Sequence, residues 1–326
     1  MKSPSPSLCP QCPSGETPFN PVSQSPSTMK IPMIKKLASL CLTLAAGALV
    51  AHAQLYWDPL STGGSGGSGT WNLNGTANWY GNLGAVKWTD NSASGTDQAI
   101  FSGTAGTVAL NSSLSASNLT FYIDGYTISG SGTLTLGSGG IDASGVYGVT
   151  TIGNPLLLAP GQQLWQIGSG GTLAVNGAIT RDAGAAVDFS AAGITSSSLA
   201  NDATGIIGGW ATVGAYNNTL GDWAANDGSG NIMAYTGYTA VSATANSSPD
   251  LTGAASQNWL AGDPTGAANY VTTITNTTSL HSLVVQGDVS LSSGATLTLD
   301  SGGLILRGPS RWFAAGSTTT SLLTSG

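Results

Sequence analysis

Two stretches of this chain carry the same order of apolar residues, and this repetition constrains the fold more than any other feature. Residues 118–141 read NLTFYIDGYTISGSGTLTLGSGGI, and residues 282–304 read SLVVQGDVSLSSGATLTLDSGGL. After a one-residue deletion the apolar positions match at one constant offset along the chain. The matching pairs are Ile128 with Leu291, Leu134 with Leu297, Leu136 with Leu299, and Ile141 with Leu304. A flexible Gly/Ser linker has no reason to keep such a register, so we interpret the stretch as a duplicated structural unit.

The repeat also predicts local structure. Leu134 and Leu136 alternate with Thr133 and Thr135, which places the leucines on one face of a β-strand and the threonines on the other. The flanking glycines suit tight turns. Apolar residues at every second position predict further strands at 108–114, 118–123, 126–128, 151–158, 163–167, 172–175, 186–189, 271–274, 282–285 and 289–291.

Many short strands in similar units predict an all-β protein, and we expect a right-handed parallel β-helix, which is a solenoid. A third, shorter copy, GGTLAVNGAI, lies at 170–179. We interpret the spacing from Leu134 to Leu173 as two coils of about 20 residues each. Charged residues make up only 7% of the chain, which suits a ladder in which like side chains stack. A β-sandwich is the alternative architecture.

A tryptophan-rich segment, residues 56–88, precedes the repeats, and its tryptophans are Trp57, Trp71, Trp79 and Trp88. We expect it to form an N-terminal cap with buried tryptophans, because the first coil of a solenoid has to be covered. The alternative is a tryptophan surface that stacks on sugar rings. Within the segment, residues 61–70 (STGGSGGSGT) lack apolar alternation and are interpreted as a flexible turn.

The N-terminal region has the pattern of a secretory signal peptide at residues 29–53. Three lysines precede an apolar run from Leu37 to Val50, and Ala51 and Ala53 form an A-x-A signal-peptidase recognition site. The apolar run is shorter than the roughly 20 residues that a membrane-spanning helix needs. We therefore expect cleavage before Gln54, and no other segment resembles a transmembrane helix. Residues 1–28 are expected to be disordered and to come from an upstream mis-start.

These observations predict the domain organisation. A first β-helical unit covers residues 54–205, a connecting segment covers 206–270, and a second, truncated β-helical unit covers 271–326.

Signal cleavage would change the charge and redox chemistry of the chain. All three cysteines precede Gln54, so the mature chain would contain neither disulfides nor thiolate metal ligands. Its fourteen aspartates face only Lys87, Arg181, Arg307 and Arg311, which gives a net charge near −10. Such a charge disfavours nucleic acid as a partner.

The mature chain is poor in groups for acid–base catalysis, and we expect it not to be an enzyme. A Ser-His-Asp triad would have to use His281, the one histidine after Gln54. The aspartates, such as Asp124, Asp142, Asp202 and Asp300, are expected to be scattered in turns. The oxygen-rich stretch ANDGSGN at 225–231 matches no calcium motif and is interpreted as a turn. We therefore predict no catalytic, cofactor-binding or metal-binding residue.

The combination of 119–141, QLWQIGSGGTLAVNGAI and the segment from GGWATVGAY to GYTAV resembles the autotransporter-associated β-strand repeat proteins, also called passenger-associated transport repeat proteins. The resemblance covers about residues 55–326. It implies a secreted or surface β-helical stalk, on the extracellular side of the outer membrane, whose repeats assist export through the export machinery. We thus expect a non-catalytic structural or adhesive passenger that contacts surface glycans or other cells. The alternative is a secreted β-helix that binds or cleaves polysaccharides.

Overall fold

The structure is a computed structural model that describes residues 53–89, 97–190, 192–215, 221–241, 250–252, 255–262, 271–307, 313–315 and 323–325. In these residues the regular elements are β-strands, and no helix occurs.

The strands are β1 (Gln54–Trp57), β2 (Gly69–Trp71), β3 (Trp79–Gly81), β4 (Gly84–Val86), β5 (Gln98–Phe101), β6 (Thr107–Leu110), β7 (Leu114–Phe121), β8 (Thr127–Ser129), β9 (Leu134–Ala143), β10 (Val149–Ile152), β11 (Leu156–Leu158), β12 (Gly161–Ile167), β13 (Thr172–Val175), β14 (Ile179–Arg181), β15 (Ala185–Phe189), β16 (Ile194–Ser196), β17 (Ala211–Val213), β18 (Asp222–Asn226), β19 (Ile232–Ala234), β20 (Thr239–Val241), β21 (Asn258–Ala261), β22 (Val271–Ile274), β23 (Thr278–Val285), β24 (Asp288–Leu291), β25 (Leu297–Leu306), β26 (Phe313–Ala315) and β27 (Leu323–Ser325).

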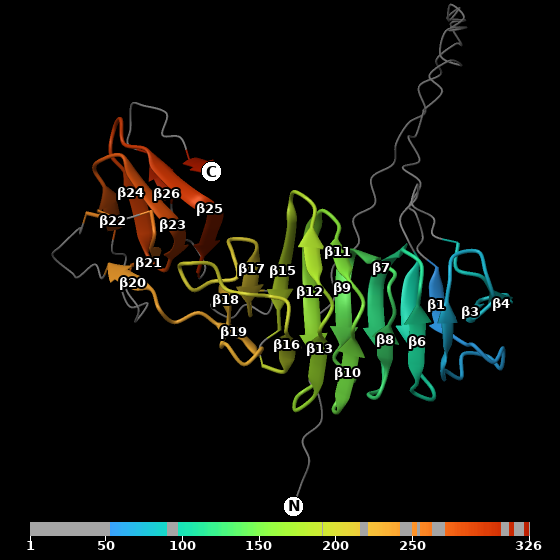
Figure 1. The fold of residues 1–326 in the computed structure, drawn as a ribbon. Helices are drawn as coiled ribbons and strands as arrows, with labels where there is room; N and C mark the ends of the chain where they lie inside the picture. Colours follow the sequence, from blue (N-terminus) through green and yellow to red (C-terminus); the bar gives the residue numbers. More distant parts are fainter. Residues whose placement is uncertain are drawn as a thin grey trace, which may run out of the picture. The chain divides into compact units, whose positions relative to one another are not determined.

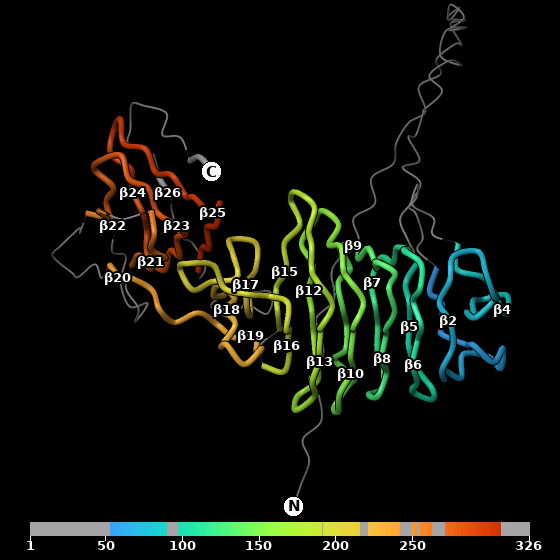
Figure 2. Tube along the Cα trace, viewed as in Figure 1, coloured from blue at the N-terminus to red at the C-terminus, as the bar shows by residue number. Residues whose placement is uncertain are grey.

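Successive coils stack these strands in parallel, so the protein is an all-β parallel β-solenoid and the predicted fold class is confirmed. One ladder runs through β5, β7, β9, β12, β15 and β17, and a second runs through β6, β8, β10, β13 and β16. Figures 1 and 2 show these strands side by side in chain order. Between β19 and the C-terminal end, β21, β23 and β25 form one parallel ladder, while β22, β24 and β26 form another.

Each full coil contributes three strand segments. The first half of β9 pairs with β11, whereas its second half pairs with β12. The long strands β7 and β9 therefore span two sides of a coil, which later coils divide between two separate strands. The third side is the ladder of β8, β10 and β13. Most of the strands that alternation predicted are present, including those at 133–136, 172–175 and 282–285. The strand predicted at 108–114 is divided, because β6 ends at Leu110 and β7 begins at Leu114.

The coils are a few residues longer than the expected period. Ile141 lies opposite Leu119, and Trp165 in turn lies opposite Ile141. Leu173 pairs with Ile194, in a different sheet from Leu134, which pairs with Leu156. The interpretation of the spacing from Leu134 to Leu173 as two coils is therefore wrong. Similar T-L-x-[LV] strands occupy different sides of the coil.

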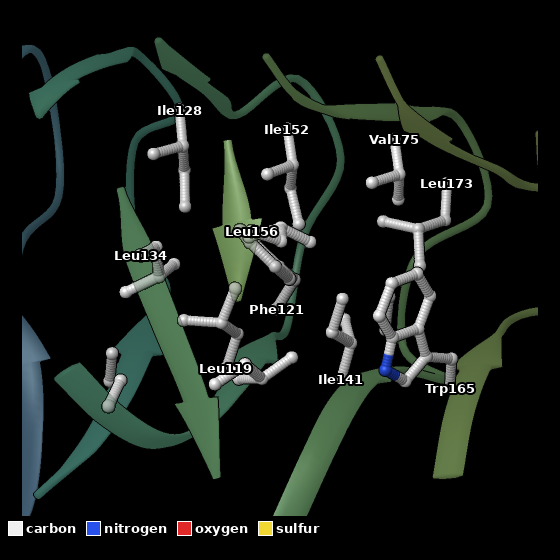
Figure 3. Packing of buried hydrophobic residues seen from close by; sticks show 14 of the residues in the cluster. Leu119, Phe121, Ile128, Leu134, Ile141, Ile152, Leu156, Trp165, Leu173 and Val175 are labelled. Atoms are coloured by element: carbon white, nitrogen blue, oxygen red, sulfur yellow. The ribbon is translucent and has the colours of Figure 1, made fainter. Parts of the chain in front are cut away.

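The core consists of apolar ladders along the inside of the coils. Ile128, Ile152 and Val175 are successive register partners in one ladder, and all three are fully buried. Figure 3 shows these side chains directed toward those of Leu134, Leu156 and Trp165, which come from the other two sides. Because neighbouring coils stack apolar residues in register, the alternation in the sequence becomes a largely apolar core.

The two repeated stretches share an irregularity that the sequence alone does not reveal. In β7 and β9 the pairing shifts between Ala116–Leu136 and Asn118–Gly140. In β23 and β25 it shifts at the matching place, between Leu280–Leu299 and Ser282–Gly303. The longer path on the second strand marks a β-bulge, which turns the strand around the corner of the coil. The matched sequence positions therefore correspond to matched backbone geometry.

Antiparallel strands border the parallel ladder of residues 54–234 at both ends. At the start, β1 pairs with β3, and β3 pairs with β4, both antiparallel. At the other end, β17, β18 and β19 pair in antiparallel fashion. The segment 206–270, expected to be a connection, contains β17 to β21 in its described residues, and β21 pairs in parallel with β23. The division into units at 205 and 270 stays a prediction.

Candidate functional site

The four tryptophans of the N-terminal segment do not form a sugar-stacking surface. Trp57, Trp71, Trp79 and Trp88 are each at most 1% exposed. Trp71 lies 4.9 Å, between ring centroids, from both Trp79 and Trp88 in edge-to-face contacts. Two of the indole N–H groups donate to backbone oxygens, one from Trp57 to Gly67 and one from Trp88 to Ser115. The expected tryptophan-rich cap is therefore present, and its rings serve packing.

The turn after β1 is organised by a buried aspartate that sequence reasoning missed. Asp58 is fully buried, and its carboxylate accepts hydrogen bonds from the backbone N–H groups of Thr62 and Gly63 at 3.0 and 2.9 Å. Burial alone would raise the pKa of Asp58, but these N–H groups and those of Gly64 and Ser65 hold it below its ordinary value. The segment 61–70, interpreted as a flexible turn, is thus bound in place at its start. The Asp-Pro sequence at 58–59 was the available signal.

Two tyrosines lie side by side on the outer face of this cap. Tyr56 of β1 and Tyr80 of β3 are direct cross-strand partners, next to the pair Trp57 and Trp79. Because side chains alternate along a strand, the tryptophans enter the core while the tyrosines face outward. Tyr80 is 38% exposed, and Tyr56 is half-buried.

The tyrosines line a recess of about 240 Å³ whose other lining residues are Gln54, Gly63, Gly81 and Asn82. None of these side chains is charged. Gln54 and Asn82 are exposed amides that carry both donors and acceptors. The loop held by Asp58 forms one wall: Gly63 has a φ of +96°, and nothing lies within 4 Å of the place a Cβ would take. We call this site the tyrosine recess.

His281 pairs with an aspartate rather than with a nucleophile. Its Nε2 lies 2.8 Å from Oδ2 of Asp202, and Oδ1 of Asp202 accepts hydrogen bonds from the N–H and hydroxyl of Thr204. Burial raises the pKa of Asp202, but the bonds from Thr204 and the proximity of His281 outweigh it and lower the pKa. In the described part of the chain, no hydroxyl is hydrogen-bonded to the His281 ring.

The aspartates of the other predicted turns also act locally. Asp227 accepts hydrogen bonds from the backbone N–H groups of Ser229 and Asn231 and from the Asn231 amide. Its pKa is lowered mainly by that amide and by the Ser229 N–H. The oxygens of Asp227 thus stabilise the turn between β18 and β19.

Asp142 and Asp300, which were expected in turns, lie instead within the strands β9 and β25. No group of acidic, His or Cys side chains able to hold a metal ion occurs among the described residues.

A polar groove of about 380 Å³ lies beside this turn, and Asn226 is part of its lining. The Asn226 amide donates to the carbonyl oxygens of Ser196 and Leu199 and accepts from Gly228 and Gly230. The side-chain amide of Asn226 therefore already has hydrogen-bond partners within the protein, at the end of the ladder.

Of the two predicted signal-peptidase residues, Ala51 lies outside the described residues. Ala53 is described and exposed, and β1 starts at the next residue, Gln54. The cleavage site stays a prediction. In the residues that the structure describes, no helix has the length and apolar character needed to cross a bilayer.

The fold is a parallel β-solenoid whose N-terminal end is covered by the tryptophan-rich cap. Over 198 residues the chain is 36% identical to adhesin BmaC autotransporter of Brucella suis biovar 1 (strain 1330). The alignment covers 53% of this chain but only 6% of that protein, so the chain spans a small part of its relative's length. No family model and no solved structure matches the chain.

Proposed function

We propose that the chain is an exported, non-catalytic β-helical passenger of the autotransporter-associated repeat type, which acts in adhesion at the cell surface. The observation that carries this proposal is the combination of a parallel β-solenoid with similarity to an autotransporter adhesin over about half of the chain. A long stack of coils exposes much surface and few reactive groups, which suits contact rather than catalysis.

The polar residues support a structural role. His281 and Asp202 bond to one another, while Asp58 and Asp227 hold turns. These contacts suit groups that stabilise the fold. No observation favours the cleavage of polysaccharides.

Export follows from the sequence in this proposal. The signal at 29–53 directs secretion with cleavage between Ala53 and Gln54, and the repeats assist export because each coil can fold onto the preceding one. N-terminal sequencing of the protein recovered from outside the cell should begin at Gln54. A sequence that retains residues 1–28 would contradict this part of the proposal.

The adhesive function is tested with the purified full chain coated on beads. Coated beads should adhere to cultured host cells above the level of beads coated with albumin, and free protein should compete. Adhesion equal to the albumin control would overturn the adhesive role.

A further inference from the structure

We propose that the tyrosine recess is a binding site for a neutral oligosaccharide. The proposal deepens the adhesive function and rests on it for the source of the ligand, a glycan on the contacted surface. It replaces the tryptophan surface considered from the sequence, because those rings are buried in the cap.

The first argument is the aromatic platform. Tyr56 and Tyr80 are adjacent across two antiparallel strands, and both line the same recess. The face of an aromatic ring carries negative charge density, and the C–H groups on one face of a pyranose ring are weakly positive. Two neighbouring tyrosines on a sheet offer a surface that matches one or two sugar rings.

The second argument is the polar rim. Gln54 and Asn82 lie in the lining, and each amide supplies donors and an acceptor to hydroxyl groups. The Gln54 amide meets Gln98 only through a long 3.5 Å hydrogen bond. An apolar centre with a few directional polar groups is the usual composition of a small-molecule site.

The third argument is charge and preorganisation. The lining holds no charged side chain, so no arginine or lysine side chain is placed there to hold a phosphate or an acidic sugar. The platform is fixed from behind, since Trp57 and Trp79 pack at 5.1 Å between ring centroids. The loop wall is fixed by Asp58. A site that is already shaped loses little conformational freedom on binding.

The test uses isothermal titration calorimetry of the full chain with cellohexaose, maltohexaose and laminarihexaose, and with hexagalacturonate as the acidic probe. At least one neutral hexasaccharide should bind, and the acidic probe should bind at least tenfold more weakly. Tyr80→Ala and the double variant Tyr56→Ala/Tyr80→Ala should weaken binding by about tenfold or more. Tyr80→Phe, which keeps the ring, should retain binding.

The matched control is Tyr147→Ala, because Tyr147 is 71% exposed and does not line the recess. Its affinity should equal that of the wild type. Circular dichroism verifies the fold of each variant; if the double variant unfolds, Gln54→Ala/Asn82→Ala replaces it with the same expected loss. No binding of any neutral hexasaccharide, or equal binding by the recess variants, would overturn the proposal.

Bead adhesion with the same variants separates this proposal from the adhesive function. Wild-type adhesion without any oligosaccharide binding would overturn the proposal that the tyrosine recess binds sugars, and it would support the adhesive function. Oligosaccharide binding that depends on Tyr80, without adhesion, would support the recess and remove the adhesive function.

Discussion

Gly140 lies so close to Leu164 of the next coil that a Cβ on Gly140 would stand 2.3 Å from the Leu164 carbonyl oxygen. Gly140 also has a φ of +66°, a conformation that costs other residues about 1–2 kcal/mol. Gly140→Ala would therefore combine backbone strain with a steric clash between coils. We expect a loss of about 3 kcal/mol or more in the free energy of unfolding, measured by urea denaturation.

Gly184→Ala is the control for that experiment. Gly184 has a φ of +82°, but nothing lies within 4 Å of the place its Cβ would take. This variant should therefore lose only the conformational cost of about 1–2 kcal/mol. Equal losses at the two positions would contradict the close approach of the coils at Gly140.

Asp58 should make the cap sensitive to acid. Its pKa is lowered from the ordinary value of 3.8 in the folded chain, so its contribution to stability is present above that value and is lost as the pH falls through the folded pKa. Asp58→Asn should lose about 1–3 kcal/mol at pH 7, because hydrogen bonds to a charged acceptor are strong. It should also show a weaker decline between pH 5 and about pH 2 in urea denaturation.

Asp142→Asn is the control variant for Asp58→Asn in the same urea denaturation. The Asp142 carboxylate accepts one hydrogen bond from a backbone N–H group, that of Ser144, at the surface of a coil. A decline for Asp58→Asn as steep as that of the wild type would argue against the role of the charge.

Tyr126 predicts a loss of stability in alkali. Burial raises the pKa of Tyr126 to about 12, although a backbone hydrogen bond opposes the shift. Between pH 10 and pH 12 the unfolded chain gives up the phenolic proton before the folded chain does, so the free energy of unfolding falls as the pH rises. Tyr126→Phe should show a smaller fall over this range in thermal unfolding.

At pH 7 the same variant loses the hydroxyl bonds to the carbonyl oxygens of Ser102 and Thr104, which should cost about 1 kcal/mol. A pH profile identical to that of the wild type would contradict the raised pKa.

The apolar ladder can be tested at Leu156, which is fully buried beside Leu134. Leu156→Ala should destabilise the protein by about 2–5 kcal/mol because it leaves a cavity between coils. Leu60→Ala, at a side chain that is 69% exposed, should change stability by less than about 0.5 kcal/mol. Chemical denaturation followed by tryptophan fluorescence measures both.

The coil register can be tested by cysteine pairs. Thr135 and Leu157 are parallel register partners and lie on the outer side of the strands, so Thr135→Cys/Leu157→Cys should form a disulfide under mild oxidation. Thr135→Cys/Ala174→Cys, which keeps the spacing from Leu134 to Leu173, should not, since Ala174 belongs to a different ladder. Non-reducing electrophoresis after proteolysis distinguishes the two results.

The sequence was sufficient for the local structure but not for the pairing. Alternation at Leu134 and Leu136 correctly predicted a strand with a buried face, because that pattern depends only on the period of two. It could not say that Leu156, rather than Leu173, lies opposite Leu134, since similar short strands occur on each side of a coil.

The candidate site was harder to predict than the fold. The tryptophans of the cap and Tyr56 have the same local appearance in the sequence, and only the pairing of β1 with β3 decides which rings are buried. Asp58 likewise becomes a structural residue only when the backbone of residues 62–65 turns around it. Charge and composition contain no information about which residues lie on the outward face of a strand.

The length of chain between register partners such as Ile141 and Trp165 has a mechanical consequence for a protein held between two surfaces. A folded coil adds about 4.8 Å to the length of a stack, whereas the same coil pulled straight reaches about 80 Å. Because each coil contacts mainly its neighbours, tension would release coils one after another. The solenoid would then lengthen in discrete steps under load, and each step would lower the force at the two ends of the stack.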